Sequence, residues 1–275
     1  MFSDTVNSIQ FEANNLVWKA DLIGQGPKLL IAFHGYGQNA DVFRHMEELM
    51  QDEYTFMLID LAFHRHQKEF PQGFIFDAEY SKQWISAILE KSGKSVVSLM
   101  GFSIGARIAM FVAQNNSDKV NEIWLIAPDG LPVSKAYSLL THSWFGKRLF
   151  KNFVQSPAIA NLLIKLGESL KLISSKAAKF YRHEISSLAM RQQLFDTWIS
   201  YREALPDYQS LNQLNDKGKL AITCILGKDD AIIRFQKTRK FIRKKLPDAQ
   251  IIELEIGHNI LSDKGVKKLF EYWKA

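Results

Sequence analysis

The chain has 275 residues, of which 47% are hydrophobic and 23% charged, a balance that excludes a disordered chain and fits one large domain or a domain with an insertion. Its formal net charge is +6, but the sequence contains no paired Cys/His ligands and no aromatic RNA-binding motif, so no nucleic-acid partner is expected. No apolar run approaches the roughly 18 residues that span a bilayer, and we therefore expect no transmembrane segment.

The first residues and the cysteine usage indicate where the chain is located. The start lacks the basic and apolar regions of a secretory signal. The single cysteine, Cys224, excludes an internal disulfide and fits a reducing compartment. We predict a cytoplasmic protein in which Cys224 is a small buried hydrophobic residue.

The first half of the chain predicts strands that alternate with helices. Residues 8–13 and 16–23 are expected to form an N-terminal hairpin. The later strands are expected at 28–35, 55–63, 95–101 and 120–128, and the helices at 41–52, 81–93 and 104–115. This alternation is typical of the α/β class, with a mostly parallel sheet and helices on both faces.

After Pro128 the alternation stops, and residues 131 to 217 are helical in pattern. It resumes with strands at 220–227 and 250–257 and with helices at 234–246 and 266–274. We predict a core of residues 1–130 and 218–275, with residues 131–217 inserted as a helical lid. Open parallel sheets bind ligands at the carboxyl ends of their strands, and the lid is expected to cover that edge.

The excess positive charge lies in the predicted lid, because residues 132–217 contain 12 Lys and Arg against 6 Asp and Glu. The ordinary interpretation is a solvated helical face. The alternatives are attraction of an anionic substrate or a weak contact with a membrane surface.

The segment LMGFSIGARIAM, residues 99–110, places Ser103 between two glycines where a predicted strand turns into a helix. Glycines at such a corner allow the strand and the helix to approach closely and the serine to project. A hydroxyl needs a base to act as a nucleophile, and His258 follows the last predicted strand. The strand before it ends in Asp229 and Asp230, either of which could orient a histidine.

Four motifs therefore stand at predicted strand ends: His34-Gly35-Tyr36-Gly37, Gly101-Phe102-Ser103-Ile104-Gly105, Gly227-Lys228-Asp229-Asp230 and Gly257-His258. Together they resemble the α/β-hydrolase superfamily over nearly the whole chain. The resemblance implies Ser103 as nucleophile, His258 as general base and acid, and Asp230 as the acid of the triad. Asp129 is the alternative acid, since some members place that residue after the preceding strand.

The resemblance also implies an oxyanion hole formed by backbone N–H groups. Ile104, directly after the nucleophile, supplies one donor and Tyr36 the other. The sequence has Tyr36 where many lipases have glycine, which leaves a bulky side chain near the pocket. His34 is interpreted as a structural residue that orders this loop.

A serine at the corner argues against dehalogenase and epoxide-hydrolase chemistry, which use an aspartate there. We predict a serine carboxylesterase or thioesterase acting on a small or acyl-chain substrate. Apolar lid residues are candidates for an acyl pocket or for packing on the core: Trp144, Phe145, Phe153, Leu162 and Trp198. No HExxH or GxGxxG motif suggests a metal or redox cofactor, and none is expected.

Two alternatives to the esterase remain open. The segment GFSIGAR resembles the corner of a menaquinone-pathway lyase that uses the same triad, with Arg107 at the position of an arginine that recognises an anionic substrate. A carbon–carbon bond hydrolase is a further possibility of the same kind, and a helix-surface arginine is the simpler interpretation of Arg107. The other alternative is a non-catalytic binding protein on this fold.

Overall fold

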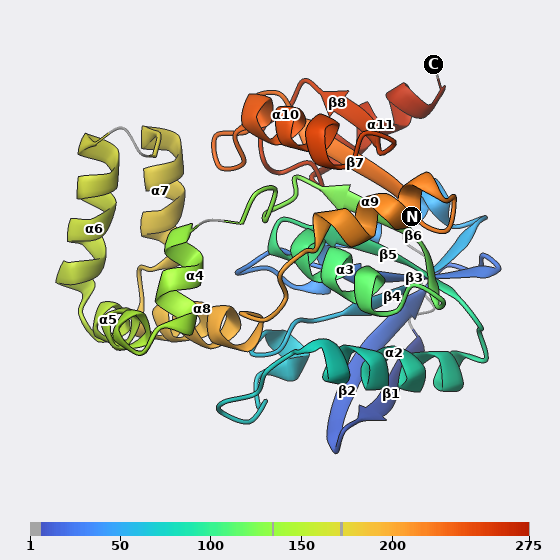
Figure 1. The fold of residues 1–275 in the computed structure, drawn as a ribbon, viewed down its shortest axis with the longest axis horizontal. Coiled ribbons are helices and arrows are strands. Elements are labelled where there is room, and N and C mark those ends of the chain that lie inside the picture. Colours follow the sequence, from blue (N-terminus) through green and yellow to red (C-terminus); the bar gives the residue numbers. More distant parts are fainter. Residues whose placement is uncertain (1–6, 134, 171–172, 275) are drawn as a thin grey trace.

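The structure, a computed structural model, describes residues 7–133, 135–170 and 173–274. The prediction that the first residues are not a secretory signal falls partly on residues 1–6, which lie outside the described residues. The centre of the molecule is an eight-stranded sheet in the order β1-β2-β4-β3-β5-β6-β7-β8, in which β1 and β2 are antiparallel and the remaining strands are parallel to one another (Figure 1). The strands are β1 Asn7–Ala13, β2 Leu16–Ile23, β3 Lys28–Phe33, β4 Tyr54–Ile59, β5 Val97–Phe102, β6 Val120–Ile126, β7 Ala221–Gly227 and β8 Gln250–Leu254. This confirms the predicted fold class.

Both faces of the sheet are buried, which is why its central strands are apolar throughout. Along β3, Leu29 and Ile31 enter one core layer, while Leu30 enters the other. Helices α2, α3, α9 and α10 contribute to the first layer, and α1 and α11 to the second. These helices are α1 Arg44–Met50, α2 Ala78–Ser92, α3 Ile104–Asn115, α9 Tyr208–Asp216, α10 Phe235–Lys245 and α11 Asp263–Lys274, with short 3-10 turns at Ala40–Phe43 and Arg65–Gln67.

Several element boundaries differ from the sequence expectation, and three of the differences have a clear local reason. The helix expected over 41–52 divides into a 3-10 turn and α1, with Asn39 capping the turn. The strand expected over 55–63 ends at Ile59, because the Asp60 side chain accepts hydrogen bonds from backbone N–H groups of the surrounding loops. Helix α2 begins earlier than expected, because Asp77 caps it by accepting from the N–H of Tyr80.

Five helices, α4 to α8, lie together on one side of the molecule, away from most of the sheet (Figure 1). They are α4 Lys135–His142, α5 Trp144–Gln155, α6 Pro157–Ser169, α7 Ser175–Glu184 and α8 Leu188–Ser200. We call these five helices the lid. Four of them begin after a serine whose hydroxyl accepts from a backbone N–H three residues on: Ser143, Ser156, Ser174 and Ser187. Such caps are each worth about 1 kcal/mol.

Helix α9 falls within the inserted segment predicted at 131–217, yet it contacts α3 and α10. Its Leu211 is fully buried in the main core layer. The extent of a separate inserted domain stays a prediction. Across the described residues, no helix has both the length and the apolar character needed to cross a membrane.

Candidate active site

Ser103 occupies a strained corner between β5 and α3, with φ 53° and ψ −117°. A Cβ on Gly101 would lie 2.3 Å from the Gly105 carbonyl oxygen, and one on Gly105 would lie 2.0 Å from that of Phe33. Both glycines are therefore required by close backbone approaches. The Ser103 N–H donates to the Ile126 carbonyl at 3.0 Å, which ties the corner to the end of β6. The strain is stored where a nucleophile elbow would need it.

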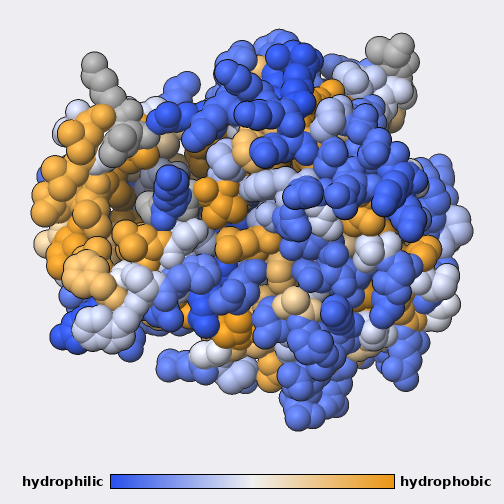
Figure 2. Space-filling model, in the orientation of Figure 1, coloured by the Kyte–Doolittle hydropathy of each residue, from blue (hydrophilic) through white to orange (hydrophobic). Residues whose placement is uncertain are grey.

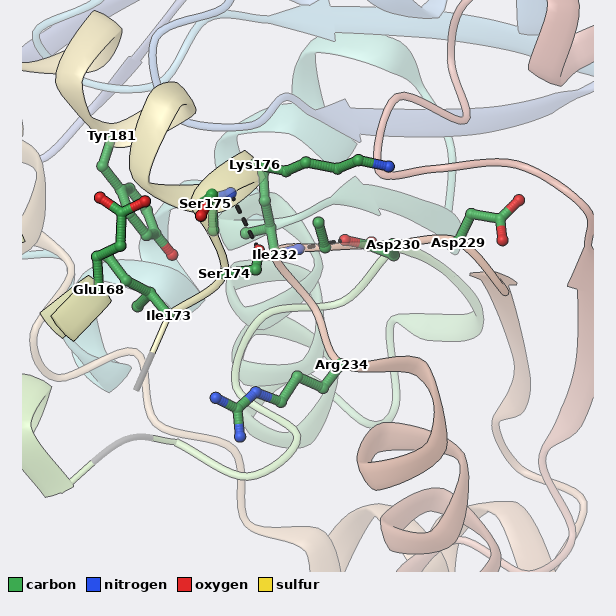
Figure 3. A pocket seen from close by; sticks show the side chains of 12 residues that line it. Glu168, Ile173, Ser174, Ser175, Lys176, Tyr181, Asp229, Asp230, Ile232 and Arg234 are labelled. Atoms are coloured by element: carbon green, nitrogen blue, oxygen red, sulfur yellow. Dashed lines mark hydrogen bonds between the residues drawn. The ribbon is translucent and has the colours of Figure 1, made fainter. Parts of the chain in front are cut away.

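His258 and Asp230 meet at the ends of β8 and β7. The His258 Nδ1 lies 2.7 Å from Asp230 Oδ2, and the carboxylate is almost completely buried. The other oxygen of Asp230 accepts from the backbone N–H groups of Ile232 and Ile233, both at 2.8 Å. Figure 3 shows Asp230 beside Ile232. An ionised carboxylate only accepts hydrogen bonds, so Nδ1 carries the proton and Nε2 keeps a free lone pair. In the neutral imidazole, this arrangement leaves Nε2 as a hydrogen-bond acceptor.

The elbow lies beside this pair, because the Phe102 ring is 5.1 Å from that of His258. The hydrogen bonds found among the described residues do not include one from Ser103 Oγ to His258. Such a bond often tightens only when substrate is bound. The structure thus joins His258 to Asp230 and packs Phe102, the residue before Ser103, against the imidazole.

Asp129, the alternative acid, is arranged differently. Its backbone N–H donates to the Ser103 carbonyl at 3.1 Å, so it helps to hold the elbow. Its side chain is 46% exposed, and its nearest charged partner is Arg107 at 3.9 Å. The hydrogen-bonded partner of His258 is Asp230.

The start of α3 packs against the loop after β3, which brings the two expected oxyanion donors, Ile104 and Tyr36, into neighbouring segments. The contact is made at Gly105, where a Cβ would lie 2.7 Å from the His34 carbonyl oxygen. His34 is fully buried, and its Nε2 accepts from the Leu61 N–H at 2.9 Å while Nδ1 lies 2.7 Å from the Gly35 carbonyl. Burial lowers the pKa of His34 to about 4. It is a neutral residue that orders the loop.

His64 supports the same loop from the other side. The Gly37 N–H points to His64 Nε2 at 3.4 Å, and burial lowers the pKa of His64 to about 3. Sequence reasoning had no signal for this role, since His64 lies in a polar stretch without periodicity.

The Tyr36 side chain reaches into the lid. Its hydroxyl donates to the Met190 carbonyl at 2.8 Å, and burial raises its pKa. Next to it, a Cβ on Gly37 would lie 2.3 Å from a carboxylate oxygen of Glu184, at the end of α7. The bulky residue expected near the pocket thus connects the loop after β3 to the lid.

Arg107 is not on the helix surface, which corrects the simpler sequence interpretation. It is only 1% exposed, its Nη2 donates to the Tyr137 hydroxyl at 2.9 Å, and its guanidinium lies 4.1 Å from the centre of that ring. It therefore fastens α3 to α4, and its recognition of an anionic substrate stays a prediction.

The two tryptophans proposed for substrate binding also have other surroundings. Trp144 is 75% exposed, with Arg148 over its ring, so it faces solvent at the start of α5. Trp198 packs edge-to-face against Tyr137 and Phe150, where α4, α5 and α8 meet. The structure does not bring either ring to Ser103 in any contact found among the described residues.

A cavity of about 580 Å³ lies between the lid and the loop after β7 (Figure 3). It is lined by Glu168, Ile173, Ser174, Ser175, Lys176, Ala177, Tyr181, Asp229, Asp230, Ala231, Ile232 and Arg234. It borders the candidate acid, while Ser103 and His258 are not among these described lining residues. Burial, and next the carboxylates of Asp129 and Asp230, raise the pKa of Tyr181. The lid residues of this cavity carry no motif that the sequence could have revealed.

Within the described ranges, no cluster of three or more His, Cys, Asp or Glu side chains is arranged to hold a metal ion.

Residues 28–265 match the family model of the alpha/beta hydrolase fold, and the chain belongs to that family. Over 118 residues it is 27% identical to a pimeloyl-[acyl-carrier protein] methyl ester esterase of Vibrio parahaemolyticus serotype O3:K6. That match covers 42% of this chain and 41% of the relative, so the aligned part is less than half of either protein. The predicted family is confirmed, and its assignment as a hydrolase is supported.

Solved structures match over nearly the full length. A thermophilic esterase from Thermogutta terrifontis has a TM-score of 0.64 at 16% identity, with 98% of each chain covered. A haloalkane dehalogenase from Agrobacterium tumefaciens C58 has a TM-score of 0.63 at 15% identity, covering 99% of this chain and 97% of its own. Two different activities fit equally well, so these likenesses establish the fold and leave the chemistry to the residues.

Proposed function

We propose that this chain is a serine hydrolase that cleaves a carboxylic ester or thioester through an acyl-enzyme, with Ser103 as nucleophile, His258 as base and Asp230 as the orienting acid. The observation that carries the proposal is the 2.7 Å hydrogen bond from His258 to the buried Asp230 carboxylate, beside a serine in a strained elbow. That combination supports acyl transfer over dehalogenation, because the residue at the elbow is a serine.

In the first half of the reaction, Ser103 Oγ attacks the carbonyl carbon while its proton passes to His258 Nε2. The tetrahedral intermediate collapses, the C–O or C–S bond breaks, and His258 returns the proton to the leaving alcohol or thiol. A water molecule then attacks the acyl-enzyme, giving a proton to His258, and the acid is released as Ser103 regains its proton. Asp230 keeps its negative charge and stabilises the imidazolium in both halves.

The negative charge that develops on the carbonyl oxygen is stabilised, in this proposal, by hydrogen bonds from the backbone N–H groups of Ile104 and Tyr36. One such donor is typically worth about 3 kcal/mol of transition-state stabilisation. Support for the pair comes from the close packing of α3 on the loop after β3 at Gly105, where a side chain would collide with that loop.

The substrate class proposed is a small or acyl-chain ester. The curated relative acts, by its name, on a methyl ester carried by an acyl-carrier protein. A cavity of about 580 Å³ beside Asp230 supplies room next to the proposed triad. We also propose that residues 131–217 form an inserted lid. A cytoplasmic location is a separate proposal, which rests on the single buried cysteine, Cys224. A contact of the basic lid with a membrane surface belongs to the same proposal.

A fluorophosphonate probe combined with p-nitrophenyl esters of increasing chain length tests the function. We expect covalent labelling and ester cleavage by the native chain, and loss of both in Ser103→Ala. Ser86→Ala, at an exposed serine on α2, is the matched control and is expected to behave as native. An unlabelled, inactive native chain would instead support the non-catalytic binding protein, and an active Ser103→Ala variant would overturn the mechanism.

A further inference from the structure

The outer face of α6 is apolar and uncovered. Its inward residues Ala160 and Ile164 are buried in a small cluster of the lid. The outward stripe has helical spacing and consists of Ile159, Leu162, Leu163, Leu166 and, just past the end, Leu170. Because both sides of the helix are apolar, packing against the rest of the lid leaves one of them in contact with water.

The stripe continues onto α5, where Trp144, Phe145 and Leu149 are exposed. Figure 2 shows hydrophobic side chains gathered on the side of the molecule formed by these helices. We call these eight residues of α5 and α6 the outer lid face. Contiguous apolar patches of this kind on a soluble protein mark sites that contact a membrane or a partner.

Positive charge accompanies the outer lid face. Helix α5 contains Lys147, Arg148 and Lys151 and no acidic residue. Helix α6 contains Lys165 and Glu168, and Glu168 is paired with Arg182 of α7. The segment 132–217 has 12 basic and 6 acidic residues in all. Two copies of so basic a segment repel each other, whereas a negatively charged surface attracts it. Charge complementarity therefore favours an anionic occupant over a second copy of the chain.

We propose that the outer lid face docks on an anionic lipid surface. The leucines and Phe145 enter the boundary between headgroups and acyl chains, Trp144 lies at the interface, and the lysine ammonium groups extend to lipid phosphates. A flat lipid surface accommodates a stripe that runs along one helix and across to its neighbour. This inference assigns the membrane contact proposed above to the outer lid face, and it does not depend on catalysis by Ser103.

The position of the cavity gives this docking a consequence. Glu168 and Ile173 line the cavity, and they flank Leu170 at the end of the stripe. A docked lid thus brings this wall of the cavity close to the lipid surface. If the proposed esterase activity holds, its substrates are acyl esters presented at a membrane.

The test uses the full chain with Ser103→Ala and sedimentation with vesicles, so that binding is measured without turnover. Vesicles of phosphatidylcholine and phosphatidylglycerol at 7:3 are expected to bind the protein, and pure phosphatidylcholine to bind it at least tenfold more weakly. Leu163→Ser/Leu166→Ser is expected to reduce binding to the anionic vesicles at least tenfold. The matched control is Val17→Ser/Val96→Ser, which removes two exposed valines outside the lid and is expected to leave binding unchanged.

Absence of binding to anionic vesicles, or equal losses in the two double variants, would overturn the proposal. So would a dimer in light scattering that Leu163→Ser/Leu166→Ser dissociates, since the face would then bind a second copy. Competition by an acidic protein would also overturn it, if that protein displaces the chain from anionic vesicles and binds Leu163→Ser/Leu166→Ser as tightly as it binds the native chain. Failure of the esterase proposal shows instead as an inert Ser103 in the native chain, with vesicle binding intact.

Discussion

The sheet and the lid differ in the exposure of their apolar side chains. The sheet buries them on both faces, and outside 132–217 the formal charges of the chain balance. Of the fifteen large hydrophobic side chains exposed among the described residues, eleven lie between 139 and 188. The proposed triad and oxyanion donors come from the sheet side, where packing fixes positions closely. The lid leaves apolar side chains exposed, and we propose that they contact a surface outside the chain.

The largest effect that separates the two regions is expected at the triad acid. Asp230→Asn removes the charge that holds the His258 tautomer and should lower kcat by about 10⁴ while leaving the fold intact. Asp129→Asn is the matched control, and kcat is expected to change by less than about tenfold because its carboxylate is half exposed. Steady-state ester hydrolysis measures both variants. A larger loss in Asp129→Asn would transfer the role of the acid to that residue.

Removing one tryptophan from each region compares their packing directly. Trp84→Ala empties a fully buried site in the core and should lower the free energy of unfolding by about 3–5 kcal/mol. Trp144→Ala, on the exposed lid face, should change it by less than about 0.5 kcal/mol. Urea unfolding measures both. Similar losses in the two variants would mean that Trp144 is buried in solution.

Acid should destabilise the sheet side through His34 and His64. Both accept a backbone N–H at Nε2, and their pKa values are lowered to about 4 and about 3 from 6.5. The unfolded chain therefore binds more protons as pH falls below 6.5, and stability falls by about 1.4 kcal/mol per pH unit for each histidine until its folded pKa is reached. Above pH 6.5 neither contributes a pH dependence.

His64→Gln should remove one of these two contributions and flatten the acid limb of the unfolding free energy. His183→Gln, at an exposed position in the lid, is the control and should leave the slope unchanged. An identical acid limb in native protein and His64→Gln would show that His64 is protonated in the folded state.

The smallest effect is expected where the two regions touch. Tyr36→Phe removes the hydrogen bond to the Met190 carbonyl and should lower the free energy of unfolding by about 1 kcal/mol. Hydrogen exchange at the start of α8 should increase, since that segment loses its tie to the loop after β3. Unchanged exchange there would show that other contacts hold the lid in place.

The sheet side was largely predictable, and the lid was not. Strands buried on two faces leave continuous apolar runs, and glycines forced by close backbone contact bracket Ser103 visibly in the sequence. The pairing of His258 with Asp230 stays a prediction as to its catalytic role, although the structure joins the two side chains. In the lid, both sides of α6 are apolar, so the pattern could not say which side faces inward. The cavity residues come from segments far apart, and only the folded chain brings them together.

Tyr36 sets a boundary on how this molecule could diversify. Its backbone belongs to the loop proposed to stabilise the reaction, and its hydroxyl donates to the Met190 carbonyl in the first turn of α8, while Glu184 fills the space above Gly37. Sequence changes on α5 and α6 leave these contacts alone, so that surface can vary with the environment of the protein. Changes between 184 and 190 would disturb the loop after β3, which contains Tyr36 and Gly37. We therefore expect sequence changes there to affect the proposed chemical step as well.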